Sequence, residues 1–566
     1  MKRLIAFVMM SAITAMVAHV DIVSATTITV NTTSMTGIET GDGLPEECSI
    51  YDAVVAARSD TSTNGCPAGD ANPEGDTILL PSGTFDGFNK PVMSVSGDKI
   101  QIIGQGKTET ILKDLTILNG GSFFFSLRDV ELLRSRVTMT STGSTSNTLE
   151  VAEVKMTGGA ISIRQNDTST TTSLLRDIEG VKDTVNSINS YINIFSHSPN
   201  SGNTVVRNVT LAGQGGYTGI SYYSPYGTSD LIVENSVISG YGTGIFSNEC
   251  TEYSEPVYSL HITNSSIGGG DMLTGVYAAC GHVVVNDTIF HDIIGSALLV
   301  DTNYMSPACV TQYSSRVEVY NTTFTRISPS ITAPGVVYVE AVLDGCTGVQ
   351  SQTSASSLIM RHNTFADNSL ASFANIAVTN GAVIDGFVVQ NNAFQGRALS
   401  GLFTSTSAPV VTHNLTTDTR EPEDGFHRVA TLLLGALADN GGAALIGANG
   451  SGGHVLTMRP LWGSPLIDGA PDVGLTTDQR HQPRAQLRLN SYDIGAVEVS
   501  RQEVLGDGLV ASQLDEYING TATVVPAATL AKTGIDMAWP LASAALLVVI
   551  PVIFRLLEKL ARATTS

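Results

Sequence analysis

Four polar residues in one short stretch have the types and spacing that acid–base chemistry uses. Asn286 and Asp287 are followed closely by His291 and Asp292. A carboxylate and an imidazole within hydrogen-bond reach can act as general base and general acid. The alternative is that His291 and Asp292 lie on the turn that leaves a strand. We favour this alternative and expect no catalytic residue in the stretch.

The elements that must position these residues are strands of a repeating unit. From about residue 204 to residue 403 one phrase recurs: two alternating apolar residues, a polar position and a further apolar residue. A short phrase that returns with loops of variable length between its copies is typical of a solenoid. We therefore predict an all-β fold, a right-handed parallel β-helix that resembles the pectate-lyase solenoid. Strand alternation alone also permits a β-sandwich.

The polar position of the phrase is usually filled by Asn, with His362 in one copy. In a solenoid, equivalent side chains of successive coils stack above one another, and an amide both donates and accepts hydrogen bonds. We therefore expect a buried amide ladder formed by Asn208, Asn235, Asn264, Asn286, Asn321 and Asn391. Weaker copies of the phrase begin at Phe125 and Leu149, so the coils should start before residue 125.

The charge of the chain opposes any polyanionic partner. The formal net charge is −22 at pH 7, and the sequence contains no basic run. Because proteins bind phosphate backbones through Lys and Arg, we expect no nucleic-acid partner. Charged residues make up only 14% of the chain and glycine contributes 55 residues, which favours strands and turns over long exposed helices.

The N-terminus has the features of an export signal. Lys2 and Arg3 precede an apolar segment, and small residues predict cleavage between Ala25 and Thr26. An uncleaved membrane anchor is the alternative, and both place the bulk of the chain outside the cytosol. Cysteines in an oxidising compartment favour disulfides. Proximity in the sequence suggests the pairs Cys48–Cys66, Cys250–Cys280 and Cys309–Cys346, although other pairings remain open.

Three segments near the N-terminus form a recognisable pattern. They are Thr27–Asn31, Cys48–Val54 and Gly75–Phe85. Together they resemble the CSLREA module of bacterial surface β-helix proteins, in which a Cys-containing helical turn caps the open end of the solenoid. The resemblance implies the same role here, although Ile-Tyr-Asp stands where the family has Leu-Arg-Glu. A cap is also needed physically, because the first coil would otherwise expose apolar side chains and unpaired backbone groups.

A second pattern spans residues 405–500. Its segments, in order, are Leu437–Gly442, Ser464–Gly469, Thr477–Arg480, Pro483–Arg484 and Tyr492–Glu498. The pattern resembles the choice-of-anchor Q region that closes the same class of proteins, although His481 stands where that family usually has Gly. This resemblance implies that the region closes the far end of the coils.

The charged residues of that closing region suggest ion pairs. We expect Asp478 and Asp493 to pair with Arg480 or Arg484 and to hold the last coil shut. A calcium site formed by Asp468, Asp472 and Asp478 is the alternative, but the spacing matches no standard calcium loop. We therefore expect neither a metal nor a cofactor.

The C-terminus combines three parts that resemble a sortase-type wall-sorting signal. They are the pentapeptide Leu530, Ala531, Lys532, Thr533 and Gly534, an apolar span and a basic tail. In that class an LPxTG-like motif is cut between Thr and Gly and joined to the cell wall, and here Ala531 replaces Pro. The apolar span is long enough to cross a bilayer as a helix, so permanent residence in the membrane is the alternative. Both place the protein on the extracellular face of the cell.

These observations predict a display protein. Pectin-hydrolase-like sites use the patterns N-x-D, G-H-G and R-x-K, and the sequence contains none of them. We expect adhesion to a glycan, the matrix or another cell without catalysis. The alternative is a carbohydrate-active enzyme, which a lateral pocket with three or more converging Asp, Glu, His or Arg side chains would favour. The expected divisions are signal peptide 1–25, cap and first strands 26–99, β-helix 100–404, closing region 405–500, spacer 501–529, sorting motif 530–534, transmembrane helix 535–557 and cytoplasmic tail 558–566.

Overall fold

The structure is a computed structural model, and it describes the chain from residue 26 to residue 520 with internal gaps. The described ranges are 26–35, 47–70, 75–90, 92–95, 99–120, 124–141, 147–165, 171–196, 202–224, 229–248, 259–279, 281–301, 315–340, 356–370, 373–379, 383–401, 404–405, 407–420, 425–445, 453–484, 486–488 and 490–520.

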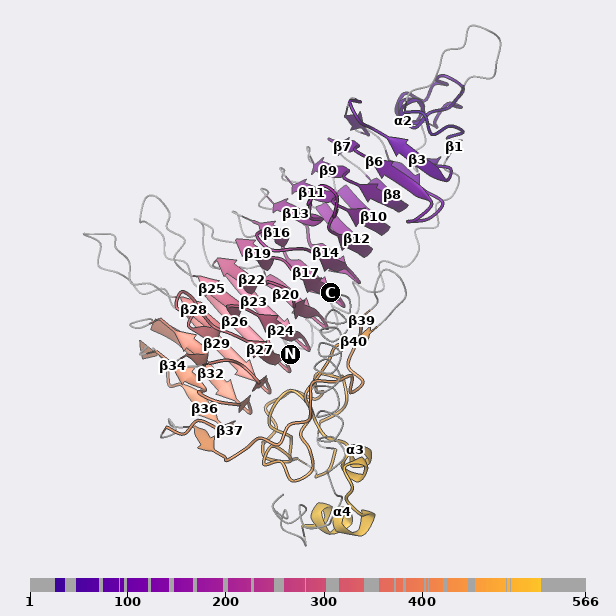
Figure 1. The fold of residues 1–566 in the computed structure, drawn as a ribbon. Helices are drawn as coiled ribbons and strands as arrows, with labels where there is room; N and C mark the ends of the chain where they lie inside the picture. Colours follow the sequence, from indigo (N-terminus) through magenta and orange to yellow (C-terminus); the bar gives the residue numbers. More distant parts are fainter. Residues whose placement is uncertain are drawn as a thin grey trace, which may run out of the picture.

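Most coils of the molecule consist of three short strands, and equivalent strands of successive coils pair in parallel. One coil contains β17 (Leu231–Glu234), β18 (Val237–Ser239) and β19 (Thr243–Asn248). Their partners in the next coil are β20 (Ser259–Thr263), β21 (Ser266–Gly268) and β22 (Thr274–Ala279), all in parallel register. Three ladders therefore run along the rod, and we call them the first, second and third ladders (Figure 1).

The ladders contain almost all strands of the molecule. The first ladder contains β1 (Thr27–Thr29), β2 (Asp76–Leu79), β5 (Ile100–Ile103), β14 (Thr204–Arg207), β17, β20 (Ser259–Thr263), β23 (Gly281–Asn286), β26 (Ser315–Tyr320), β29 (Ser356–Arg361), β32 (Val383–Gln390), β35 (Thr404–Ser405) and β36 (Val410–Thr412). The second contains β3 (Gly83–Asp86), β6 (Thr110–Lys113), β15 (Thr210–Ala212), β18, β21 (Ser266–Gly268), β24 (Ile289–Ile293), β27 (Thr323–Ile327), β30 (Thr364–Ala366), β33 (Ala393–Phe394), β37 (Asn414–Thr416) and β38 (Phe426–Arg428).

Three long strands belong to both of these ladders: β8 (Phe124–Leu133), β10 (Asn147–Thr157) and β12 (Thr171–Val181). The third ladder is a separate sheet that contains β4 (Met93–Ser94), β7 (Thr116–Asn119), β9 (Arg136–Ser141), β11 (Ala160–Gln165), β13 (Tyr191–Ser196), β16 (Thr218–Tyr223), β19, β22 (Thr274–Ala279), β25 (Ser296–Asp301), β28 (Gly335–Glu340), β31 (Ala374–Val378) and β34 (Leu399–Ser400).

A continuous column of aliphatic side chains fills the interior of the first ladder. Because side chains alternate along a strand, every second residue of each coil points inward. The column consists of Ile28, Ile78, Ile102, Leu127, Val151, Leu175, Val206, Val233, Ile262, Val285, Val319, Met360 and Val389, and each is buried. Burying such a side chain stabilises the fold by about 1.5–3 kcal/mol. The predicted parallel β-helix is confirmed, and the sandwich alternative is wrong.

The polar position of the repeat forms the corner between the first and second ladders. Asn208, Asn235 and Asn321 have φ angles of 54°, 50° and 47°, in the left-handed region that Asn tolerates better than most residues. In the copy that contains Asn286, the corner residue is Asp287, with a φ of 50°. Asn286 is the last residue of β23 and pairs in register with Tyr320. The recurring Asn therefore marks a backbone turn.

A buried polar ladder does exist, one residue after the corner. Its members are Ser236, Ser265, Thr288, Thr322, Asn363, Asn392 and Asn414. The Ser236 hydroxyl accepts a hydrogen bond from the backbone N–H of Val209 in the preceding coil, at 3.2 Å. In the later coils the position is occupied by Asn, and the side chains of neighbouring coils bond to each other: Asn363 Nδ2 donates to Asn392 Oδ1 at 2.9 Å. Each side chain thus satisfies a backbone group that the corner leaves without a strand partner.

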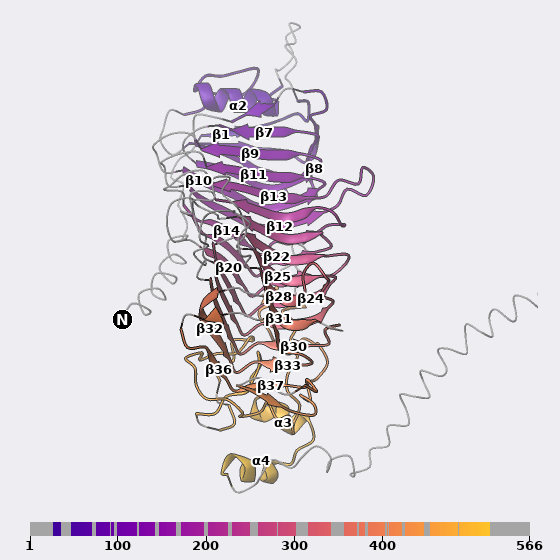
Figure 2. The ribbon, with the colours of Figure 1, turned by 90° about the vertical axis from the view of Figure 1, so that its left-hand side faces the viewer.

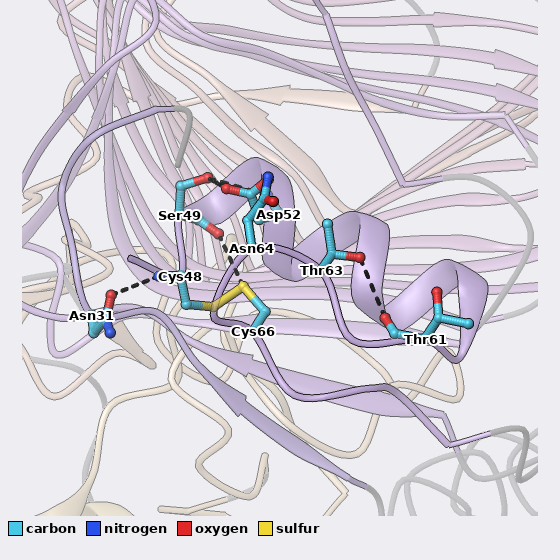
Figure 3. Close-up of a disulfide and its surroundings, with 8 residues drawn as sticks. All are labelled: Asn31, Cys48, Ser49, Asp52, Thr61, Thr63, Asn64 and Cys66. Atoms are coloured by element: carbon cyan, nitrogen blue, oxygen red, sulfur yellow. Dashed lines mark hydrogen bonds between the residues drawn. A yellow bond between two sulfur atoms is a disulfide. The ribbon is translucent and has the colours of Figure 1, made fainter. Parts of the chain in front are cut away.

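The N-terminal end is covered by α2 (Ile50–Ser59), at the opposite end of the rod from α3 (Arg501–Gly506) and α4 (Ala511–Ile518) (Figure 2). Ser49 caps this helix by accepting a hydrogen bond from the backbone N–H of Asp52 at 3.2 Å. A disulfide joins Cys48 to Cys66 beside this cap (Figure 3), as predicted. The other four cysteines, Cys250, Cys280, Cys309 and Cys346, lie outside the described residues.

The described residues from 429 to 520, which we call the C-terminal region, lie beside the later coils and beyond the last one (Figure 1). They include a short antiparallel pair, β39 (Ala444–Leu445) and β40 (Gly453–His454), and two helices, α3 (Arg501–Gly506) and α4 (Ala511–Ile518). The predicted polar spacer therefore begins with ordered helices, which bury Val504, Leu514 and Tyr517 against Ile467 and Val499.

No helix within the described ranges combines the length and apolarity needed to cross a membrane. The predicted span 535–557, the sorting motif 530–534 and the signal peptide 1–25 all lie outside those ranges.

Candidate functional site

The outer side of the first ladder from β12 to β32 carries a central row of half-buried, mainly aliphatic side chains. We call this side the open face. Its central row consists of Leu174, Val205, Ile232, His261, Val284, Glu318, Ile359 and Val388, stacked in register. A polar row flanks it on each side. The row on the corner side consists of Arg176, Arg207, Glu234, Thr263, Asn286, Tyr320, Arg361 and Gln390. The row on the other side consists of Ser259, His282, Arg316 and Ser357. In Figure 1 the first ladder lies between the third ladder and the C-terminal region.

The open face changes character where His261 and Glu318 interrupt the aliphatic row. There, His282 Nδ1 lies 2.8 Å from Ser259 Oγ, and His282 Nε2 lies 3.2 Å from Glu318 Oε1. Arg316 Nε and the Tyr320 hydroxyl also donate to the Glu318 carboxylate. A hydroxyl, an imidazole and a carboxylate are thus joined in one chain across β20, β23 and β26.

The electrostatics of this cluster indicate the charge of Glu318 and the nitrogen of His282 that carries its hydrogen. Burial acts to raise the pKa of Glu318, but the hydrogen bonds from His282 and Tyr320 and the charge of Arg316 outweigh it and lower this pKa to about 2. An ionised carboxylate only accepts hydrogen bonds, so Nε2 of His282 carries its hydrogen and Nδ1 is left to accept from Ser259. Burial lowers the pKa of the neighbouring His261, with Asp230 opposing, so His261 is a neutral imidazole at pH 7.

The residues singled out in the sequence do not converge on one site. Arg326 donates two hydrogen bonds to Asp292, from Nε to Oδ1 at 2.6 Å and from Nη2 to Oδ2 at 2.7 Å. His291 Nδ1 lies 2.8 Å from Asp292 Oδ2. The Arg326 hydrogen bonds lower the pKa of Asp292 to about 2. Asp287 lies 3.4 Å from His481 of the C-terminal region. These carboxylates are therefore engaged in ion pairs that join parts of the fold.

The corner residues form the surface on which the C-terminal region docks. Asn321 Nδ2 donates to the carbonyl of Thr477 at 3.0 Å, and Asn391 Nδ2 donates to the carbonyl of Pro471 at 3.0 Å. Outer side chains of the second ladder are covered as well, since Val237 and Ile289 pack against Leu437, Leu445 and Val455. The C-terminal region thus covers the second ladder from β18 to β30 and contacts the corner residues beside the open face.

The predicted closing ion pairs are present in part. Asp478 pairs with Arg480 at 3.0 Å, and Arg480 also pairs with Glu503. The buried Arg484 pairs with Glu498 at 3.5 Å and donates to Asn321 Oδ1 at 2.7 Å. Asp493 instead accepts hydrogen bonds from the backbone N–H groups of residues 468 and 499, each at 2.7 Å. Sequence reasoning missed Glu498 and Glu503, whose partners lie in other loops.

The acidic residues weighed as calcium ligands are also distributed differently. Asp468 lies close to Asp493 and Glu498, with one carboxylate oxygen of each within 4.8 Å of the others. Asp478 instead uses its oxygens for the backbone N–H groups of residues 480, 482 and 498. Because Asp493 and Glu498 likewise accept from backbone N–H groups, these carboxylates fasten the loops of the C-terminal region to one another.

A pH dependence follows from His481, which lies 2.9 Å from Asn264 Oδ1 as well as close to Asp287. The hydrogen bond to Asp287 raises the pKa of His481 above its usual value. The stabilisation is therefore fully present below the unfolded-state pKa of about 6.5 and is lost as pH rises through the higher folded-state pKa. We expect His481→Gln to lower the urea midpoint at pH 6 and to have little effect at pH 9. An equal effect at both pH values would contradict this assignment.

No family model and no curated protein matches the chain. Among solved structures it is similar to the mannuronan C-5 epimerase AlgE4 A-module of Azotobacter vinelandii, with a TM-score of 0.38 and 15% identity, over 65% of this chain and 96% of that one. It is also similar to pectate lyase Pel9A, with a TM-score of 0.29 and 12% identity, over 84% and 97%. A mannuronic acid specific polysaccharide family 6 lyase from human gut microbiota has a TM-score of 0.25 and 12% identity, over 62% and 85%. Scores of this size carry no inference about what this chain does.

Proposed function

We propose that the protein binds a polysaccharide along the open face, outside the cell. The observation that carries this proposal is the in-register stacking of the central row from β12 to β32, which is aliphatic except at His261 and Glu318. One polar row follows it on the corner side along this whole length, and a second polar row flanks it from β20 to β29. A sugar ring presents apolar C–H faces and a rim of hydroxyl groups. A repeating polymer of such rings matches a surface that repeats one apolar and two polar positions at the strand spacing of about 4.8 Å.

The charge of the protein points to a neutral polymer. With a formal net charge of −22, the chain repels polyanions at long range. Most guanidinium groups on the open face are already paired, such as Arg176 with Glu150 at 2.8 Å and Arg207 with Glu234. Neutral hydroxyl groups can still bond to such paired side chains, whereas a carboxylated polymer would compete with the resident carboxylates.

The placement outside the cell rests on the sequence. The export signal ending at Ala25, the resemblance of residues 26–99 to the CSLREA cap and the sorting-like motif Leu530–Gly534 all support a surface-held rod. In this proposal the membrane, or a sortase and the cell wall, retains the C-terminus. Release of the protein from cells by lysozyme supports the wall, and release only by detergent supports the membrane.

Binding is tested with variants of the central row. Ile232 and Ile359 are half-buried on the open face, and we expect Ile232→Gln and Ile359→Gln each to weaken binding about fivefold. Each change removes about 1 kcal/mol of apolar contact. The probes are acetylated xylan and acetylated glucomannan in isothermal titration calorimetry, with polygalacturonate as the polyanion.

The matched control is Ile331→Gln, because Ile331 is 90% exposed on a turn away from the open face. This variant should bind as the unmodified protein does. Equal binding by all three variants, or binding of polygalacturonate alone, would refute the proposed site.

A further inference from the structure

We propose that Ser259, His282 and Glu318 form an acyl-transfer site that removes a small ester group, of acetyl size, from the polysaccharide on the open face. This inference rests on the proposed function and adds a reaction to it. The three side chains come from consecutive coils, on β20, β23 and β26, and register alone brings them together.

The hydrogen bonds give each group one role. Ser259 Oγ donates to His282 Nδ1 at 2.8 Å, and His282 Nε2 donates to Glu318 Oε1 at 3.2 Å. A hydroxyl next to an imidazole, which a carboxylate in turn orients, is the arrangement that activates a serine nucleophile. Glu318 is fixed in this position because Arg316 and Tyr320 occupy its remaining acceptor sites.

The reaction balances with water as the only co-reactant. Ser259 Oγ attacks the ester carbonyl carbon, while His282 Nδ1 takes the hydroxyl proton. The bond between the carbonyl carbon and the sugar oxygen then breaks, and His282 gives the proton to that oxygen, which leaves as a sugar hydroxyl group. Water next attacks the acyl-serine with His282 again as base, which releases the carboxylic acid and restores Ser259.

The surroundings limit the substrate. Ser259 is 5% exposed, so only a small acyl group that projects from the polymer can reach its hydroxyl. Arg316 is the register partner of His282 and its side chain is 55% exposed. Its guanidinium, anchored to Glu318 through Nε, places cationic N–H donors beside the imidazole, where they can stabilise the oxyanion that forms on the ester.

A second group of the same residue types, on the second ladder, provides the comparison. There His291 Nε2 lies 3.1 Å from Ser266 Oγ, and His291 Nδ1 lies 2.8 Å from Asp292. The carboxylate of Asp292 accepts hydrogen bonds from Nε and Nη2 of Arg326, so its charge is balanced by the guanidinium. Ser266 lies in register between Val237 and Ile289, two residues that pack against the C-terminal region. Ser266 is therefore a matched control, because it has the same kinds of hydrogen-bond partner as Ser259 but does not lie on the open face.

The experiment measures acetate released from acetylated xylan and acetylated glucomannan by the full chain, and hydrolysis of p-nitrophenyl acetate. We expect Ser259→Ala and His282→Gln each to lower both rates about 100-fold or more. Ser259→Ala should still bind the polysaccharide. Ser266→Ala should retain the rates of the unmodified protein, and equal melting temperatures should show that all variants are folded.

Two results would overturn the acyl-transfer site: no hydrolysis of either the acetylated polymers or p-nitrophenyl acetate by the unmodified protein, or an equal loss of rate in Ser259→Ala and Ser266→Ala. Failure of polysaccharide binding is a separate result. If p-nitrophenyl acetate hydrolysis still depends on Ser259, the site stands and the proposed polymer is wrong. If binding persists without any hydrolysis, the proposed function stands and the acyl-transfer site is wrong.

Discussion

Replacing Arg484 with alanine is expected to release the C-terminal region from the coils. The Arg484 side chain is fully buried, pairs with Glu498, and bonds to Asn321 of the coil stack and to the backbone carbonyl of Gly495. Its removal leaves the buried carboxylates of Glu498 and Asp493 with less compensating charge. Breaking a buried pair by removing one partner costs about 3–5 kcal/mol, so Arg484→Ala should show a clearly lowered urea midpoint.

The control for this change is Arg501→Ala, whose ion pair with Asp515 is about half exposed on both sides. Exposed pairs of this kind contribute at most about 1 kcal/mol. We expect limited proteolysis to cut the C-terminal region of Arg484→Ala while the coils remain intact. Equal protease resistance in the two variants would show that Arg484 does not hold the region in place.

Replacing Phe324 with alanine is expected to destabilise the coils themselves. Phe324 is fully buried and stacks between Phe290 and Phe365, with ring centroids 5.2 and 4.5 Å away. Removing a buried aromatic ring from a packed interior costs about 3–5 kcal/mol, because the cavity closes only in part. The coils on either side of Phe324 can move little to fill the cavity. The decrease in the free energy of unfolding, measured by chemical denaturation, should therefore lie in the upper half of this range.

Phe88→Ala provides the control for the ring column. Phe88 is 68% exposed, so its truncation removes almost no buried surface. If Phe324→Ala lowers the free energy of unfolding no more than Phe88→Ala does, the rings do not form a packed column inside the coils.

The coil architecture was predictable because it repeats. Alternation and recurrence are local signals, and they located the interior column. The N-terminal helix was expected from the resemblance of residues 26–99 to a capping module, and proximity in the sequence suggested the Cys48–Cys66 disulfide. The register of one copy was not predictable, because Val283, Val284 and Val285 are all apolar and two polar residues follow them. Alignment of Phe290 with Phe324 decides the register and places Asp287 at the corner.

The docking of the C-terminal region had no comparable signal. Arg484 and Asn321 are separated by 163 positions in the sequence, and no periodicity connects them. The same holds within the candidate site. Ser259, His282 and Glu318 lie in different coils, and only the register of the first ladder shows that they face one another. Aligning the outward positions of each coil would have identified them, whereas motifs within one segment do not.

The most direct test of the open face is chemical protection of its histidines. Diethylpyrocarbonate modifies accessible imidazoles, and mass spectrometry measures the modification of each histidine with and without saturating acetylated xylan. His282, with a side chain 22% exposed on the open face, should be protected in proportion to the fraction of protein bound. His454, whose side chain is 43% exposed on the C-terminal region, should react equally in both samples. Unchanged modification of His282 in the bound protein would show that the polysaccharide lies elsewhere.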